Sequence, residues 1–254
     1  MKSLARLLAL AILLAPVATP THAAKGAHVI DHVWTRPDFD PSKIQSIAML
    51  PVATFDGNLE AERLVQMKWG QTFAGAGYRW ISGTTARDLI RGIGGDSLLR
   101  AVKAGVLKGG QVDSLSAPSL CARLRVNALL SVRVDLWAQS LIQPDQAGKP
   151  STSLQLRAAL VDSAGRLLWT ASGSETAEGQ YTEPSAADET RSGTAVTRSN
   201  GIGTQGAGAP AFAEVLDRLL VRWVKLFPAR PAAAGVAAAA PASAADSLKP
   251  APHQ

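Results

Sequence analysis

The sequence predicts an α/β (α+β) fold, and three stretches of its C-terminal half carry this prediction. From Val126 to Leu136 and from Leu154 to Leu160, apolar and polar residues alternate with a period of two, which is typical of strands with one buried face. A third strand should begin at residues 166–170, after a short turn whose Gly165 can take a positive φ. We therefore expect a mixed sheet of about five strands that ends in a long antiparallel meander, with helices packed on the sheet.

The segments before this meander predict two further strands and a helix. Residues 44–52 form a nearly continuous apolar run, which fits a central strand buried on both faces. A helix should follow Asn58, because asparagine is a good N-cap and Glu60 and Glu62 lie in the next turn, where the helix dipole favours anions. Residues 78–82 predict a short second strand.

Three shorter helices are expected between this strand and the meander. Thr85 and Asp88 have the spacing of a capping box, and the glycines at 94–95 should end the helix that they begin. A second helix is expected over residues 96–104. A third should begin after Ser116, with a proline in its first turn.

The clearest helix of the chain should begin near Pro210. Its apolar residues recur at the i, i+3, i+4 and i+7 spacing of a helix with one buried face. They are Phe212, Val215, Leu216, Leu219, Leu220, Trp223, Val224 and Phe227. This helix is expected to cover one face of the sheet.

The two ends of the chain predict segments outside the domain. Residues 1–23 contain two basic residues, an apolar run and then Thr21-His22-Ala23, which is the order of a cleavable signal peptide. We therefore expect a periplasmic protein that is not a lipoprotein, since no cysteine lies near the cleavage point, and no transmembrane helix in the mature chain. Residues 228–254 are rich in alanine and proline and predict a disordered tail.

Between these ends the chain predicts a single α/β domain over residues 44–227, preceded by an extended lead-in over residues 24–43. Residues 173–208 are rich in Gly, Ser, Thr and Ala and predict a flexible loop. Loops of this length are either functional or disordered, and the composition leaves both open.

Charge and cysteine content narrow the class of protein. The formal net charge is +6, but the basic residues are scattered and are not interleaved with aromatic residues. Nucleic-acid binding usually requires a basic stripe or a recognisable motif, so we expect no nucleic-acid partner. Cys121 is the only cysteine, and its leucine neighbours predict a small buried apolar residue.

The motifs in the chain predict no catalytic, cofactor-binding or metal-binding residues. Residues 201–206 match G-x-G-x-x-G, but the segment before them is polar, so a flexible loop is expected instead of a dinucleotide site. His28 and His32 are four residues apart, yet no third metal ligand is identifiable. The mature chain's other histidine, His253, lies in the tail, and no G-x-S-x-G elbow exists, so a serine hydrolase is not predicted.

The acidic residues are interpreted as caps and turns, and the tryptophans as core residues. Asp56, Asp135 and Asp162 fall at the ends of predicted elements, where aspartate usually forms caps and turns. The interpretation of the protein as a hydrolase with paired carboxylates remains an alternative. Five tryptophans could stack on a glycan, but core packing is the more frequent role of this residue. They are Trp69, Trp80, Trp137, Trp169 and Trp223.

Three stretches and the last helix resemble the group of bacterial envelope proteins that includes CsgG, LpoB and the TolB N-terminal domain. IQSIAMLPVATF resembles the opening strand of that group, and LCARLRVNALLSVRVDLW its helix-then-strand segment. LRAALVDSAGRLLWTASG resembles its hairpin, and the last helix, ending at Leu226-Phe227-Pro228, also fits. The resemblance covers residues 44–227. It implies an α/β domain that works by protein contacts in the periplasm or at the outer membrane, although this chain lacks the lipidated cysteine of many members.

Together these observations predict a non-catalytic, periplasmic or outer-membrane-associated accessory protein of the bacterial cell envelope, acting through protein–protein contacts. Its partner would be another envelope protein or a cell-wall component, and self-association stays open. The alternative is an envelope-polymer hydrolase that uses Asp or Glu residues. Catalysis would require a cleft with a carboxyl group of raised pKa, whereas an adaptor would require an exposed apolar patch or sheet edge.

Overall fold

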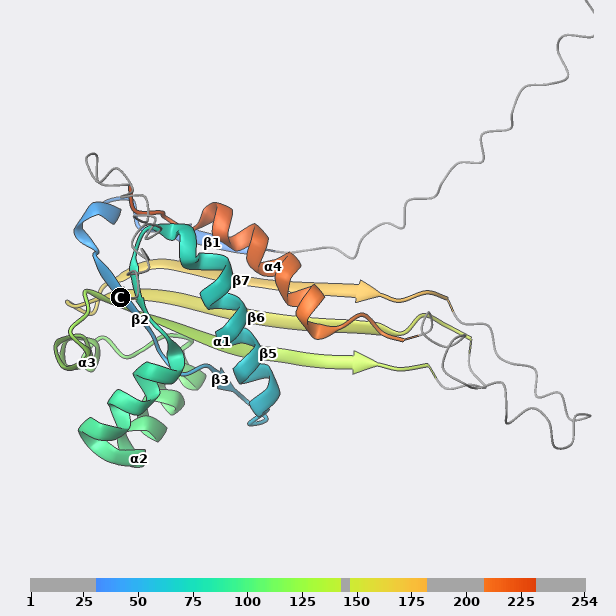
Figure 1. Cartoon of the computed structure of the whole chain (residues 1–254), viewed down its shortest axis with the longest axis horizontal. Coiled ribbons are helices and arrows are strands. Elements are labelled where there is room, and N and C mark those ends of the chain that lie inside the picture. Colours follow the sequence, from blue (N-terminus) through green and yellow to red (C-terminus); the bar gives the residue numbers. More distant parts are fainter. Residues whose placement is uncertain (1–30, 143–146, 182–207, 232–254) are drawn as a thin grey trace, which may run out of the picture.

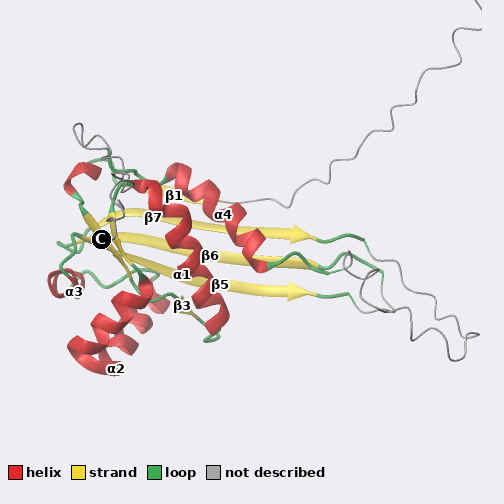
Figure 2. Ribbon diagram, in the orientation of Figure 1, coloured by secondary structure: helices red, strands yellow, loops and turns green. Residues whose placement is uncertain are grey.

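A computed structural model describes residues 31–142, 147–181 and 208–231. Within these residues seven strands form one open mixed sheet, and helices lie on both of its faces (Figures 1 and 2). The strand order is β1-β7-β6-β5-β2-β4, and β3 pairs with β5. The predicted α/β class with a mixed sheet is confirmed, with seven strands in place of about five. The predicted signal peptide and most of the predicted tail lie outside the described residues.

Long antiparallel strands dominate the sheet. The strands are β1 (Asp31–Thr35), β2 (Ser46–Met49), β3 (Ala53–Thr54), β4 (Arg79–Ile81), β5 (Ala128–Ser140), β6 (Ser151–Asp162) and β7 (Leu167–Glu178). Strands β5, β6 and β7 form the predicted meander, while β2 lies parallel to both β4 and β5. The β6–β7 turn requires Gly165, which has a φ of 77° and where a Cβ atom would overlap the carbonyl oxygen of Ser114.

Four α-helices and two 3-10 turns accompany the sheet. They are η1 (Pro41–Lys43), α1 (Leu59–Phe73), η2 (Ala74–Ala76), α2 (Gly83–Gly109), α3 (Ala117–Leu124) and α4 (Phe212–Leu226). Asn58 caps α1 as predicted, since its Oδ1 accepts the backbone N–H of Ala61 at 3.0 Å. The predicted capping box of α2 is wrong, because Ser82 is the N-cap and its Oγ accepts the N–H of Thr85. The predicted break at residues 94–95 is confirmed by their non-helical φ and ψ angles.

The two faces of the sheet carry separate cores. Helices α1 and α4 cover one face, which we call the α1–α4 face, and bury Trp69, Trp169 and Trp223 completely. Helices α2 and α3 pack on the opposite face, the α2–α3 face, against aliphatic residues such as Leu129 and Val161. The alternating pattern of the meander therefore supplies both cores, one from each face of the strands.

The structure corrects two of the predicted boundaries. Residues 31–35 of the predicted irregular lead-in form strand β1, which pairs antiparallel with β7 at the edge of the sheet. Residues 173–178 of the predicted loop belong to β7, which runs to Glu178. Their Gly, Ser and Thr residues are compatible with a strand because β6 pairs with them along its whole length. Residues 182–207 of that predicted loop lie outside the described residues.

Candidate functional site

Half of the α2–α3 face is not covered by a described helix. Helices α2 and α3 pack against β2, β3, β5 and β6, whereas β7 has its helix contacts with α4 on the opposite face. Strand β1, the part of β7 beyond Leu167 and the adjacent part of β6 therefore present one face without a described helical layer. A sheet face in an α/β domain usually lies under helices, so this exposed half is the part of the sheet available for binding.

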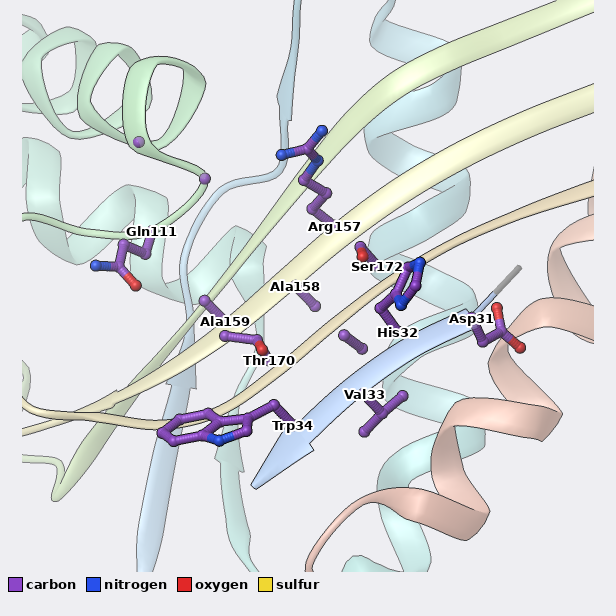
Figure 3. Close-up of a pocket in the computed structure, with 13 residues that line it drawn as sticks. Asp31, His32, Val33, Trp34, Gln111, Arg157, Ala158, Ala159, Thr170 and Ser172 are labelled. Atoms are coloured by element: carbon purple, nitrogen blue, oxygen red, sulfur yellow. The ribbon is translucent and has the colours of Figure 1, made fainter. Parts of the chain in front are cut away.

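A hollow of about 550 Å³ lies on this exposed half, between the end of α2 and the edge strand β1 (Figure 3). We call it the open-face hollow. The side chains that face it come from the segment after α2 and from the strands β6, β7 and β1 (Figure 3). They are Gln111, Arg157, Ala159, Thr170, Ser172, His32 and Trp34.

The strand register places these side chains in two rows across the sheet. In the first row, Ser172 of β7 lies opposite Arg157 of β6 on one side and His32 of β1 on the other. In the second row, Thr170 lies between Ala159 and Trp34 in the same way. Directly opposed residues have Cβ atoms about 4.5–5.5 Å apart, so each row brings three side chains together.

Two arginines and one carboxylate set the charge beside the hollow. Asp135 Oδ1 accepts from Arg133 Nε at 2.6 Å, and its Oδ2 lies 2.8 Å from Arg157 Nε. Arg133 is buried and also donates to the carbonyl of Leu107 at 2.7 Å, whereas the Arg157 side chain is 51% exposed. This group has one excess positive charge, and Arg157 brings that charge to the surface.

The acid that borders the hollow is engaged on the other face of the sheet. Asp31 points toward α4, where Arg222 Nε binds its Oδ2 at 2.6 Å and the indole N–H of Trp223 lies 3.4 Å from its Oδ1 (Figure 3). Arg222 also binds Glu175 at 2.6 Å. The described lining therefore offers the hollow a guanidinium, an imidazole, hydroxyls, an amide and an indole, but no carboxylate free of an ion pair.

The far end of the meander is a second exposed feature. Strand β3 pairs with β5 only at residues 133–134, and β1 pairs with β7 only as far as Gly173. Beyond these points the outer edges of β5 and β7 have no strand partner among the described residues, and both strands end on the same side of the molecule (Figure 1). We call residues 136–141 and 174–181 the distal end. It exposes the apolar side chains of Leu136, Leu141 and Tyr181.

The structure places the five discussed tryptophans in or against the core. Trp69, Trp169 and Trp223 are fully buried, while Trp80 and Trp137 are partly buried and pack on the same cluster. The interpretation as core residues is therefore confirmed. The sixth tryptophan, Trp34, is the exposed one, and it lies in the open-face hollow. Sequence reasoning missed Trp34 because β1 was not predicted, although Val33 alternates with His32 and Trp34 as in a strand.

The aspartates divide between turns and ion pairs. Asp56 Oδ1 accepts the N–H of Asn58, and Asp162 Oδ1 accepts the N–H of Ala164, so both have the predicted turn roles. Asp135 has a different role, because it lies at a β-bulge and binds two arginines. Cys121 is buried as predicted, and burial, with a further contribution from the negative charge of Asp162, raises the pKa of its thiol to about 11.

The histidine pair and the glycine motif form no metal or dinucleotide site among the described residues. His32 lies on a strand instead of a helix, while His28, His253 and the glycine motif at 201–206 lie outside the described residues. Within the described part of the chain, no group of three or more His, Cys, Asp or Glu side chains could hold a metal ion. In the same residues, no helix is both long and apolar enough to cross a membrane.

Comparison with known proteins gives weak structural similarities. No protein-family model matches the chain, and no curated protein matches it either. The solved structure of lipoprotein GNA1162 from Neisseria meningitidis is similar with a TM-score of 0.42 and 18% identity, covering 55% of this chain and 87% of that one. The PelC dodecamer from Paraburkholderia phytofirmans has a TM-score of 0.43 and 13% identity, covering 80% and 99%.

A third similar structure is the hypothetical protein CT253 from Chlamydia trachomatis, with a TM-score of 0.35 and 13% identity, covering 72% of this chain and 94% of that one. The similar structures thus include a bacterial lipoprotein. Membership in the particular group named from the sequence follows from none of these matches.

Proposed function

We propose that the protein is an exported, non-catalytic accessory protein of the bacterial cell envelope that acts by binding another envelope protein at its distal end. The outer edges of β5 and β7 at the distal end, which pair with no strand among the described residues, support this proposal. An unpaired strand offers a row of N–H and C=O groups to which an extended segment of a partner can add. Three exposed apolar side chains, including Leu141 at 68% exposure, would provide anchors beside that added strand.

The location in the envelope is supported by the order of residues at the N-terminus. Basic residues, an apolar run and Thr21-His22-Ala23 follow one another as in a signal peptide. We infer a periplasmic or outer-membrane-associated protein. Its relationship to the group of CsgG, LpoB and the TolB N-terminal domain is part of the same proposal.

The described carboxylates favour binding over the alternative of polymer hydrolysis. A hydrolase of this kind needs carboxyl groups that are free to exchange protons with the substrate. The buried and partly buried acidic residues named below instead bind guanidinium or ammonium groups. These pairs are Asp31 and Glu175 with Arg222, Asp135 with Arg133 and Arg157, Asp162 with Arg166, and Glu62 with Lys103.

Site-specific photocrosslinking in intact cells tests the proposal. A photoreactive amino acid at Ala138, which is exposed on the unpaired half of β5, should form an adduct with one envelope protein. The control position is Leu115, which is 86% exposed in the segment before α3 and should form no adduct with that protein. Adding Leu136→Lys and Leu141→Lys should abolish the adduct. A chain that stays in the cytosol, or one that crosslinks equally at both positions, would contradict the proposal.

A further inference from the structure

The open-face hollow combines an exposed indole with an exposed guanidinium on neighbouring rows of one sheet face. We propose that this hollow binds an acidic sugar of an extracytoplasmic polymer, with Trp34 against the face of the sugar ring and Arg157 at its carboxylate. The residues that line the hollow are distinct from those of the distal end, and the outer edge of β5 does not border the hollow, so one molecule can hold a protein partner at that edge and a polymer chain in the hollow. The ligand is a uronic acid or another sugar that carries a carboxylate.

Trp34 provides the flat apolar surface that a sugar ring requires. It is 45% exposed, whereas Trp69, Trp169 and Trp223 are fully buried, and it lies at one end of the hollow with its ring beside Thr170 (Figure 3). An exposed indole combines a large apolar face with one polar N–H group. The ring face of a hexose presents C–H groups and its rim presents hydroxyls, so it can stack on the indole while its rim bonds to neighbouring polar side chains.

Arg157 provides the charge that selects an acidic ligand. Its Nε lies 2.8 Å from Asp135 Oδ2 in an ion pair that lacks hydrogen-bond geometry, and no described residue accepts a hydrogen bond from its terminal nitrogens. A guanidinium whose terminal nitrogens have no protein acceptor can bind a carboxylate with two parallel hydrogen bonds. Asp135 has Arg133 as a second partner, and Asp31 is held by Arg222, so no unpaired carboxylate of the described lining opposes an anion.

The side chains next to the hollow favour a sugar over a peptide. Beyond Ser172 the same face of the sheet continues with hydroxyl and amide groups, and Ser153 Oγ lies 2.9 Å from Thr176 Oγ1. The polar residues of this surface are Ser151, Ser153 and Gln155 on β6 and Ser172, Ser174 and Thr176 on β7. A peptide interface usually depends on apolar anchors in desolvated pockets, which these strands do not provide here. Rows of hydroxyls instead match a ligand that carries hydroxyls along its length.

Binding measurements on the purified, full mature chain test this proposal without any protein partner. Isothermal titration calorimetry would compare a galacturonic acid tetramer with the uncharged galactose tetramer and with polyglutamate. We expect the uronate tetramer to bind, and we expect Trp34→Ala and Arg157→Gln each to weaken this binding about tenfold. Trp34→Phe should retain part of the affinity, because it keeps a ring for stacking.

The control for these variants is Leu115→Ala, which changes an exposed apolar residue away from the hollow and should leave binding unchanged. Circular dichroism of each variant would establish that the fold persists. Equal affinity for the uncharged tetramer would overturn the role of Arg157 and with it the proposal. Binding of polyglutamate in place of the uronate would identify a protein ligand and would also overturn it, as would the absence of binding. None of these results bears on crosslinking at the distal end.

Discussion

The two faces of the sheet differ in what their side chains do. On the α1–α4 face, helices and strands meet in an aromatic cluster, in which Trp69 stacks on Phe73 with ring centroids 4.3 Å apart. Phe227 closes this cluster against Trp169, with centroids 4.9 Å apart. On the α2–α3 face the core is aliphatic and covers only part of the sheet. One face therefore carries the larger buried cluster, and the other leaves part of the sheet exposed.

Strand β7 shows this difference within a single element. Its residues alternate between the two faces, because successive side chains of a strand point in opposite directions. Those toward α4 are buried, and they are Trp169, Ala171, Gly173, Glu175 and Ala177. Those on the open half are partly exposed, and they are Thr170, Ser172, Ser174 and Thr176. A substitution of a β7 residue that faces α4 should therefore lower the stability of the fold. A substitution of a β7 residue that faces the open half should instead change ligand binding.

Helix α4 gives the largest expected contrast between a covered and an exposed position. Leu220 is fully buried in the aromatic cluster, so Leu220→Asp would place a carboxylate among apolar groups and should abolish cooperative folding. The neighbouring Val221 is 46% exposed, and Val221→Asp should lower the free energy of unfolding by less than about 1 kcal/mol. Urea denaturation followed by circular dichroism measures both. Equal stability of the two variants would show that α4 does not pack on the sheet as described.

The ion pairs of α4 give the next contrast. Arg222 binds the largely buried carboxylates of Asp31 and Glu175, so Arg222→Met would leave both carboxylates without an ion-pair partner, and Asp31 would keep only the indole N–H of Trp223. Because Arg222 itself is partly exposed, we expect a loss of about 2–3 kcal/mol in the free energy of unfolding. Arg218 on the same helix pairs with Glu214 at the surface, and Arg218→Met should change this free energy by no more than about 0.5 kcal/mol. A loss in Arg222→Met no larger than in Arg218→Met would mean that the two carboxylates are solvated.

The elements that the sequence predicts correctly are those with large buried side chains. The alternation in β5 and β6 and the helical spacing in α4 both come from leucine and valine side chains, and these elements lie where they were expected. Gly95 and Gly165 act as predicted because their φ angles of 67° and 77° lie in the left-handed region that favours glycine. The hydrophobic spacing and the glycine positions in the sequence were therefore sufficient to predict these strands, this helix and these breaks.

Tertiary contacts define the elements that the sequence did not predict. Strand β1 is short and polar, and it exists because β7 pairs with it and because Arg222 holds Asp31. The second half of β7 buries Gly173, Glu175 and Ala177, which carry no hydrophobic signal of a strand. The candidate site depends on both strands, since His32 and Trp34 come from β1. The site therefore could not be assembled from the sequence, although each of its residues was visible there.

The smallest expected contrast compares two adjacent residues of β7. Gly173 lies under α4, and a Cβ atom there would overlap Asp31 Oδ1 and lie 3.1 Å from Leu219 Cδ1. Asp31 would have to leave Arg222, so Gly173→Ala should lower the free energy of unfolding by about 1–2 kcal/mol. Ser174 faces the open half of the sheet, and Ser174→Ala should change it by no more than about 0.5 kcal/mol.

A double-mutant cycle identifies the cause of the Gly173 effect. If the overlap with the Asp31 carboxylate is responsible, Gly173→Ala should be nearly neutral in a chain that already carries Asp31→Ala, because no oxygen then occupies the space of the new methyl group. Thermal and urea denaturation of the four chains give the coupling between the two positions. An equal loss with and without the Asp31 carboxylate would assign the effect to Leu219 and α4 instead. In that case the packing of the helix, and not the ion pair, would require glycine at this position of the covered face.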